Sequence, residues 1–113
     1  MEYYIVDLRP SWSRKPYITL WRPNDAGYAF PLPWAGKYDR ARVDANPNYY
    51  ATKEGARFIR FPVPCEAVER LGVKPNPRMI DGDVGPVIPN TAKARTALRR
   101  ARYLPRNATK GGA

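Results

Sequence analysis

The side chains in this chain that could do chemistry are arginines, aromatic rings and a few acids. Histidine is absent and Cys65 is the single cysteine. This composition excludes Cys/His zinc sites, histidine acid–base catalysis, serine–histidine–aspartate triads and an intramolecular disulfide. Cys65 lies at the start of a predicted helix, a position that can lower a thiol pKa. Because no histidine can act as its partner, we interpret Cys65 as a small core residue.

The acids form no catalytic or metal-binding pattern. Asp81-Gly82-Asp83 has the start of a calcium loop, but the further oxygen ligands and the closing glutamate are missing, so we expect a turn. Glu66 and Glu69 lie on a predicted helix, in a chain too short for the cleft of a glycosidase carboxylate pair. The sequence therefore predicts no metal, no cofactor and no enzymatic activity.

Basic residues are concentrated at the C-terminal end. The formal net charge is +10, and residues 90–113 carry seven basic side chains and no acid. Arginine binds carboxylates and phosphates in a planar, two-pronged geometry, so this end predicts contact with a polyanion. The alternative is a solvated helix whose basic residues favour the C-terminal end of its dipole. The candidate contact residues are Lys93, Arg95, Arg99, Arg100, Arg102 and Arg106.

Aromatic residues are concentrated earlier in the chain. Trp21, Arg22, Tyr28 and Trp34 form a possible contact surface, because rings beside cations can stack nucleobases or anchor a protein interface. The alternative is that the rings fill the core of a small domain. Trp12, in a basic loop, is either a lid over the core or an exposed anchor.

Short elements must position these side chains, because 13 of the 113 residues are proline. Residue alternation predicts strands over 2–8, 17–21, 28–30 and 56–61, the first two paired antiparallel and the last at an edge because Pro62 cannot donate to a ladder. Helices are predicted over 40–45, capped by Asp39, and over 65–71. The expected fold class is α+β, with a small antiparallel sheet of three to four strands, two short helices and a basic C-terminal helix.

The chain length predicts a single folding unit. We expect a compact α+β domain over 1–89, with a proline- and glycine-rich wrap at 73–89, and a flexible tail over 105–113. A basic amphipathic helix over 90–104, capped by Asn90, should dock on this domain. Its predicted inward residues are Ala94, Ala97, Leu98, Ala101 and Leu104. No apolar run approaches membrane-spanning length, and the N-terminus is unlike a signal peptide, so we expect a cytoplasmic protein that does not bind membranes.

The segment from Tyr17 to Tyr38 resembles an uncharacterised family of small accessory proteins encoded by phages and prophages. The similarity lies in the turn Trp21-Arg22-Pro23-Asn24-Asp25-Ala26-Gly27-Tyr28, the corner Trp34-Ala35-Gly36-Lys37-Tyr38 and the helix start Val63-Pro64-Cys65-Glu66. It covers residues 1–72 and brings no catalytic residues. The resemblance implies a non-enzymatic protein in the cytoplasm of an infected bacterium, of a class that often acts on host machinery and includes anti-CRISPR inhibitors.

Three functions are compatible with these features. The leading hypothesis is a phage accessory protein that binds a host protein or ribonucleoprotein complex and inhibits host defence through its basic helix. The first alternative is a virion-associated or accessory protein that binds the nucleic-acid backbone directly, without base reading. The second is a nucleotide-sequestering protein that uses Arg22 and the aromatic turn as its pocket. The oligomeric state is left open.

Overall fold

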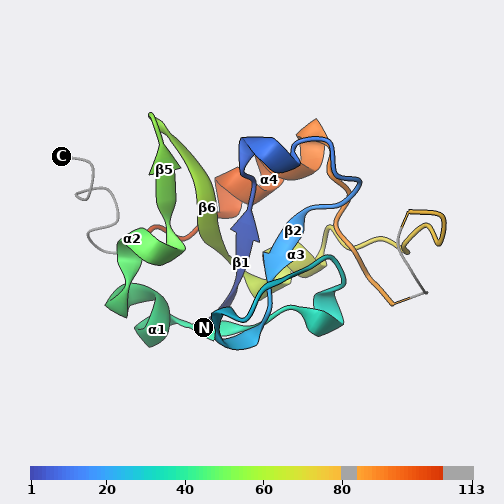
Figure 1. Ribbon diagram of the computed structural model, residues 1–113. Helices are drawn as coiled ribbons and strands as arrows, with labels where there is room; N and C mark the ends of the chain where they lie inside the picture. The colour runs from blue at the N-terminus through green and yellow to red at the C-terminus, as the bar shows by residue number, and fades with distance from the viewer. Residues whose placement is uncertain (80–83, 106–113) are drawn as a thin grey trace.

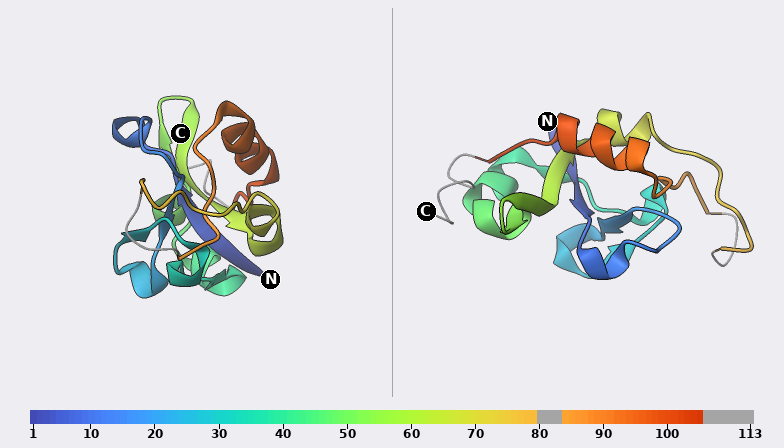
Figure 2. Two further views of the ribbon diagram at one scale, coloured as in Figure 1. Left: turned by 90° about the vertical axis from the view of Figure 1, so that its right-hand side faces the viewer. Right: turned by 90° about the horizontal axis from the view of Figure 1, so that it is seen from above.

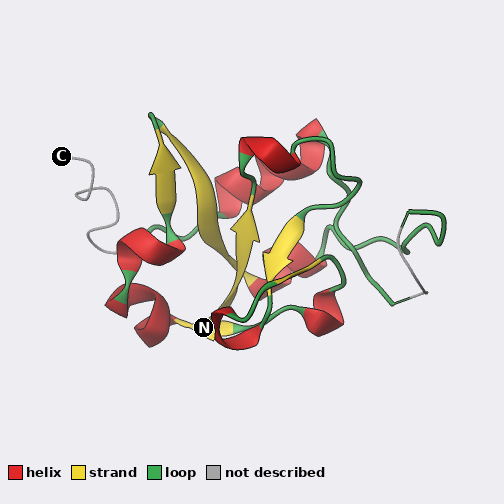
Figure 3. Ribbon diagram, viewed as in Figure 1, coloured by secondary structure: helices red, strands yellow, loops and turns green. Residues whose placement is uncertain are grey.

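The computed structural model describes residues 1–79 and 84–105, which form an antiparallel sheet with helices on both faces (Figures 1 and 3). The strand order is β3-β2-β1-β6-β5, and β4 pairs with β1 beside this path. The strands are β1 (Glu2–Asp7), β2 (Thr19–Trp21), β3 (Tyr28–Ala29), β4 (Tyr38–Asp39), β5 (Thr52–Glu54) and β6 (Arg57–Pro64). The predicted α+β class and the antiparallel pairing of β1 with β2 are confirmed.

The predicted strand number is wrong, because the sheet has six strands rather than three to four. The two strands that the sequence did not predict are β4 and β5. β4 has two residues, and β5 consists of Thr, Lys and Glu. Such segments are too short or too polar to show the alternation by which a strand is recognised. Pairing with longer neighbours, β1 and β6, holds them in place.

The sheet separates two hydrophobic cores. Alternation along β1 sends Tyr4 and Val6 to one core and Tyr3 and Ile5 to the other. Two helices, α3 (Cys65–Glu69) and α4 (Ala92–Ala101), lie against the first face, as Figure 2 shows. The second core is closed by α1 (Arg40–Ala45) and α2 (Pro47–Tyr50), through Val43 and Tyr50. This coverage of both faces leaves β1 buried over all but its first residue.

The prediction that the strand around Arg57–Phe61 lies at an edge is wrong, since β6 lies between β1 and β5. Pro62 is nevertheless accommodated, because the pairing with β5 reaches only to Arg60. Beyond that point the Pro62 carbonyl oxygen accepts a hydrogen bond from the Tyr103 backbone N–H at 2.9 Å. The N–H that proline lacks would point to the same side, away from β1.

The turn between β2 and β3 is held by side chains of the second core. Trp21 is buried, with 4% of its surface exposed. The Tyr38 hydroxyl donates to the Arg22 carbonyl oxygen and accepts from the Asp25 backbone N–H at 2.9 Å. Burial raises the pKa of Tyr38 to about 12. The turn therefore fixes the position of the aromatic residues that follow it.

The short helices begin at the residues that the sequence indicates. Asp39 caps α1, and its Oδ1 accepts from the Arg42 backbone N–H at 2.8 Å. Pro47 follows this helix and occupies the first turn of α2. Proline suits that position because its missing N–H would have no helical partner there. The helix α2 is thus additional to the three helices that the sequence predicts.

The C-terminal helix α4 spans 10 residues, Ala92–Ala101, and is shorter at both ends than the predicted 90–104. Thr91 caps it in place of Asn90, accepting from the Ala94 backbone N–H at 3.1 Å. After Ala101 the backbone becomes extended, and Tyr103 stacks on Tyr3 with the ring centres 4.8 Å apart. Leu104, predicted to face inward, is 37% exposed for this reason.

Some predictions fall on residues that the structure leaves undescribed. These are Arg106, the predicted tail beyond Pro105, and the Asp81-Gly82-Asp83 turn. In the two described ranges, no helix has the length and apolar character that crossing a membrane requires.

Candidate anion-binding site

Arg99 lies where α4 packs against β6. Its Nε is buried and has no hydrogen-bond partner among the described residues, and its Nη2 is 3.5 Å from the Phe58 carbonyl oxygen, at the limit of a hydrogen bond. Burial, followed by the charges of Arg57, Arg95 and Arg102, lowers its pKa. A guanidinium stays charged near neutral pH. The half-buried Arg99 therefore lies beside three other cations. We call Arg57, Arg95, Arg99 and Arg102 the arginine cluster.

The arginine cluster contains only part of the predicted basic set. With about 3.6 residues per turn, the basic side chains of α4 lie on two flanks of its buried stripe. One flank carries Arg95 and Arg99, with Arg102 directly after the helix, and the other carries Lys93 and Arg100. Arg57, which the sequence did not single out, joins the first flank from β6. The predicted basic residues are thus divided between two flanks, and Arg57 adds a further charge to the flank of Arg95 and Arg99.

A cavity of about 320 Å³ lies between α4, the 3-10 turn η1 (Pro10–Trp12) and the adjoining ends of β1 and β2. We call it the arginine pocket, since Arg9, Arg57, Arg95 and Arg99 contribute to its wall. Among the described residues, the acid in its wall is Asp7. The pocket therefore has more guanidinium groups than carboxylates and can accept an external anion.

Asp7 is committed to a partner inside the protein. Its carboxylate accepts from Arg9 at 2.7 and 3.1 Å and from the Trp21 indole N–H at 3.3 Å. The Asp7 side chain is fully buried, while that of Arg9 is 32% exposed. Arg9 also lies over the Trp12 ring, with the guanidinium carbon 3.9 Å from the ring centre. The buried acid thus positions Trp12 through Arg9 and neutralises little else.

Asn90 joins α4 to the loop that carries Trp12. Its side-chain amide donates to the carbonyl oxygens of Ser13 and Lys15 at 3.2 and 2.8 Å, and its Oδ1 accepts from Arg95 at 2.8 Å. The residue that we expected to cap the helix therefore sets the distance between the arginine cluster and η1.

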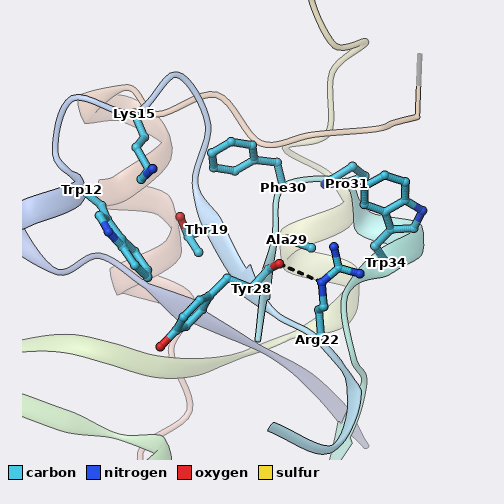
Figure 4. A pocket seen from close by; sticks show the side chains of 9 residues that line it. All are labelled: Trp12, Lys15, Thr19, Arg22, Tyr28, Ala29, Phe30, Pro31 and Trp34. Atoms are coloured by element: carbon cyan, nitrogen blue, oxygen red, sulfur yellow. Dashed lines mark hydrogen bonds between the residues drawn. The ribbon is translucent and has the colours of Figure 1, made fainter. Parts of the chain in front are cut away.

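A second cavity, of about 530 Å³, also has Trp12 in its wall (Figure 4). Trp12 and Tyr28 line one side, Trp34 and Arg22 lie opposite, and Phe30 lies between them. The side chains of Tyr28 and Trp34 are 43% and 44% exposed. We call this cavity the aromatic groove. Its rings offer faces and edges on which a planar apolar group could stack.

Cations border the aromatic groove as well. Arg22 donates from Nε to the Tyr28 carbonyl oxygen at 2.9 Å, and its guanidinium carbon lies 5.3 Å from the Trp34 ring centre. Lys15 lies over Trp12 at 5.8 Å. Among residues 1–79 and 84–105, no acid contributes to the groove wall. Trp12 and Thr19 line both cavities, so the arginine pocket and the aromatic groove adjoin.

The structure separates the predicted aromatic contact residues. Arg22, Tyr28 and Trp34 line the groove, whereas Trp21 belongs to the second core, where its indole N–H bonds to Asp7. The sequence left open whether Trp12 is a lid over the core or an exposed anchor. In the structure it is half-buried and lines both cavities. The basic loop around Trp12 was a usable signal for its role. Nothing in the sequence places Arg57 beside Arg99.

The remaining reactive groups among the described residues include Cys65 and Tyr4. Cys65 is half-buried in the first core, and burial raises its pKa to about 11, so the reactive-thiol alternative is not supported. Within residues 1–79 and 84–105, no three metal-binding side chains lie together. The Tyr4 hydroxyl donates to Glu69 at 3.0 Å, and burial raises the pKa of Tyr4.

Comparisons with protein-family models, with curated proteins and with solved structures find no match.

Proposed function

We propose that this chain is a non-enzymatic accessory protein that binds a polyanionic surface of host machinery through the arginine cluster. The resemblance to phage proteins suggests the setting, a counter-defence inhibitor of the anti-CRISPR kind. The polyanion is either nucleic acid or an acidic protein surface, because guanidinium groups bind phosphates and carboxylates by the same geometry.

The main support for this proposal is the buried Arg99 Nε, which has no hydrogen-bond partner among the described residues. A buried donor without a partner costs a folded protein about 1–3 kcal/mol, and the charges of Arg57, Arg95 and Arg102 add repulsion. An anion bound at the cluster would supply hydrogen bonds to the guanidinium groups and relieve that repulsion. Guanidinium groups do not transfer protons near neutral pH, so binding fits this site better than acid–base catalysis.

The test compares two double variants that each remove two charges. Arg57→Gln with Arg99→Gln alters the arginine cluster, and Lys93→Gln with Arg100→Gln alters the opposite flank of α4. We expect wild type and the Lys93/Arg100 variant to retain the same partner from a bacterial lysate and the Arg57/Arg99 variant to lose it. Equal retention by all three proteins contradicts the proposal.

Nuclease treatment of the lysate separates the two sources of negative charge. Loss of the partner after treatment identifies nucleic acid, and retention identifies an acidic protein surface. Binding through phosphate contacts also weakens steeply with salt, by about 0.9 in the log–log slope for each phosphate contacted on a duplex.

A single substitution provides a further control for folding. Arg99→Met keeps the aliphatic part of the side chain and removes the unpaired donor. We expect its thermal stability to equal or exceed that of wild type while binding is lost. A loss of binding that accompanies a loss of stability would instead indicate a structural role for Arg99.

A further inference from the structure

We infer that the polyanion is single-stranded nucleic acid, with phosphates at the arginine pocket and an adjacent base stacked in the aromatic groove. This inference rests on the proposed function and names the ligand class of the same site. The juxtaposition that supports it is the shared wall of the two cavities, formed by Trp12 and Thr19.

The two cavities have the complementary chemistry that a single strand requires. The arginine pocket presents guanidinium groups from three elements of the fold, the β1–η1 segment, β6 and α4. The aromatic groove presents the half-exposed rings of Tyr28 and Trp34. Proteins that bind single strands without sequence preference combine such a cationic track with aromatic rings for the bases.

A duplex fits this arrangement less well. Its bases are stacked on one another and leave no free face for Trp34, so only its phosphates could make contact. An acidic peptide could pair with the arginine cluster, but its carboxylate side chains carry no ring that would stack in the groove. Lys15 and Arg22 border the rings, and the described part of the groove wall contains no acid. The attraction to phosphate therefore continues past Trp12.

Two cations and an aromatic ring hold Trp12 at the junction. Arg9 stacks on its ring at 3.9 Å and Lys15 lies at 5.8 Å. Tyr28 meets it edge to face, with the ring centres 4.8 Å apart. These contacts hold the indole in one orientation before a ligand arrives, which reduces the ordering cost of binding.

The experiment measures binding of a labelled single-stranded oligothymidylate, about 12 nucleotides long and within the range of small single-strand sites, against a duplex of the same length. The variants are Trp34→Leu and Trp12→Leu, each with a ring-preserving partner, Trp34→Phe and Trp12→Phe. Tyr49→Leu is the control, because Tyr49 is 46% exposed and lines neither cavity.

We expect the single strand to bind more tightly than the duplex. Each leucine variant should lose about tenfold in affinity, as stacked bases typically do when the ring is removed. The phenylalanine variants should recover most of the loss, and Tyr49→Leu should bind as wild type does. Tryptophan fluorescence should be quenched by the oligonucleotide and less so in each leucine variant.

Three results overturn the inference while leaving the proposed function intact. The first is a duplex that binds as tightly as the single strand, and the second is leucine variants that bind as wild type does. The third is a nuclease-resistant partner that depends on Arg57 and Arg99 but is not displaced by the oligonucleotide. If no polyanion binds and no partner depends on the cluster, the proposed function fails as well.

Discussion

Arg9 and Asp7 form a two-pronged ion pair in which the acid is fully buried and the base is partly exposed, with the shortest N–O distance 2.7 Å. The pair raises the pKa of Arg9, chiefly through these hydrogen bonds. It also places the Arg9 guanidinium on Trp12. The buried Asp7 thus determines, through Arg9, the orientation of the Trp12 ring, which lines both the arginine pocket and the aromatic groove.

Replacing Asp7 by Asn should destabilise the protein by about 1.5–3 kcal/mol, the usual worth of hydrogen bonds to a charged group. The amide can still accept from Trp21, but it cannot hold Arg9 by both oxygens. Urea denaturation measures the change. Glu66→Gln is the control, because its pair with Arg70 is more than 70% exposed on both side chains and should change stability by less than about 0.5 kcal/mol. Equal effects of the two changes would show that the buried pair has no special role.

Leu98 should carry most of the docking of α4. It is fully buried in the first core, whereas Leu104 is 37% exposed. Leu98→Ala should cost about 2–5 kcal/mol, and Leu104→Ala less than about 0.5 kcal/mol. Thermal unfolding of the two variants distinguishes these values. The sequence pattern alone would assign the two leucines the same role, so similar losses would support the longer helix and contradict the end at Ala101.

The sequence reveals local structure where one residue determines it. Asp39 is a helix cap by its chemistry, and the apolar alternation of β1 marks a strand covered on both faces. The class of the fold follows from such elements. Asn90 shows the limit, since Asn and Thr both suit a cap and Thr91 follows it directly. The choice is made by a tertiary contact, the bonds of Asn90 to the loop carrying Trp12.

The candidate site depends on contacts between distant residues and could be predicted only in part. The basic character of α4 is visible in the sequence, and so are Arg22, Tyr28 and Trp34. The approach of Arg57 to Arg99 results from the packing of α4 on β6. Trp21 lies one residue from Arg22, yet the strand alternation turns it into the core. The residue types of the site are therefore visible in the sequence, but the contacts between them in the folded protein are not.

Gly36 should be required for the corner that carries Trp34. A Cβ there would lie 2.7 Å from the Pro23 backbone and 2.9 Å from the Tyr38 ring, so Gly36→Ala forces the β2–β3 turn away from the corner. We expect a loss of about 2–3 kcal/mol, as in other overpacked sites. Gly55→Ala is the control, since its positive φ costs about 1 kcal/mol but nothing lies within 4 Å. Chemical denaturation compares the two, and a smaller loss for Gly36→Ala would contradict the close packing.

Stability should fall at high pH because several acids have raised pKa values in the folded state. Burial raises the pKa of Cys65 from 9.0 to about 11 and that of Tyr38 from 10.0 to about 12. The folded state binds these protons more tightly, so the stabilisation is complete below about pH 9 and is lost as the pH rises through 11 to 12. The midpoint of thermal unfolding should therefore fall steadily over this range. A flat profile up to pH 12 would contradict the burial of both groups.

The same shift predicts a slow reaction of Cys65 with alkylating reagents. At about pH 8 the thiolate fraction should be roughly a hundredfold smaller than that of a thiol with its usual pKa, because two pKa units separate them. Alkylation followed by mass spectrometry should be correspondingly slow in the folded protein and fast in urea. The position of Cys65 at the start of α3 alone would favour the opposite result. A fast reaction in the folded state would mean that the helix terminus outweighs the desolvation that the first core imposes.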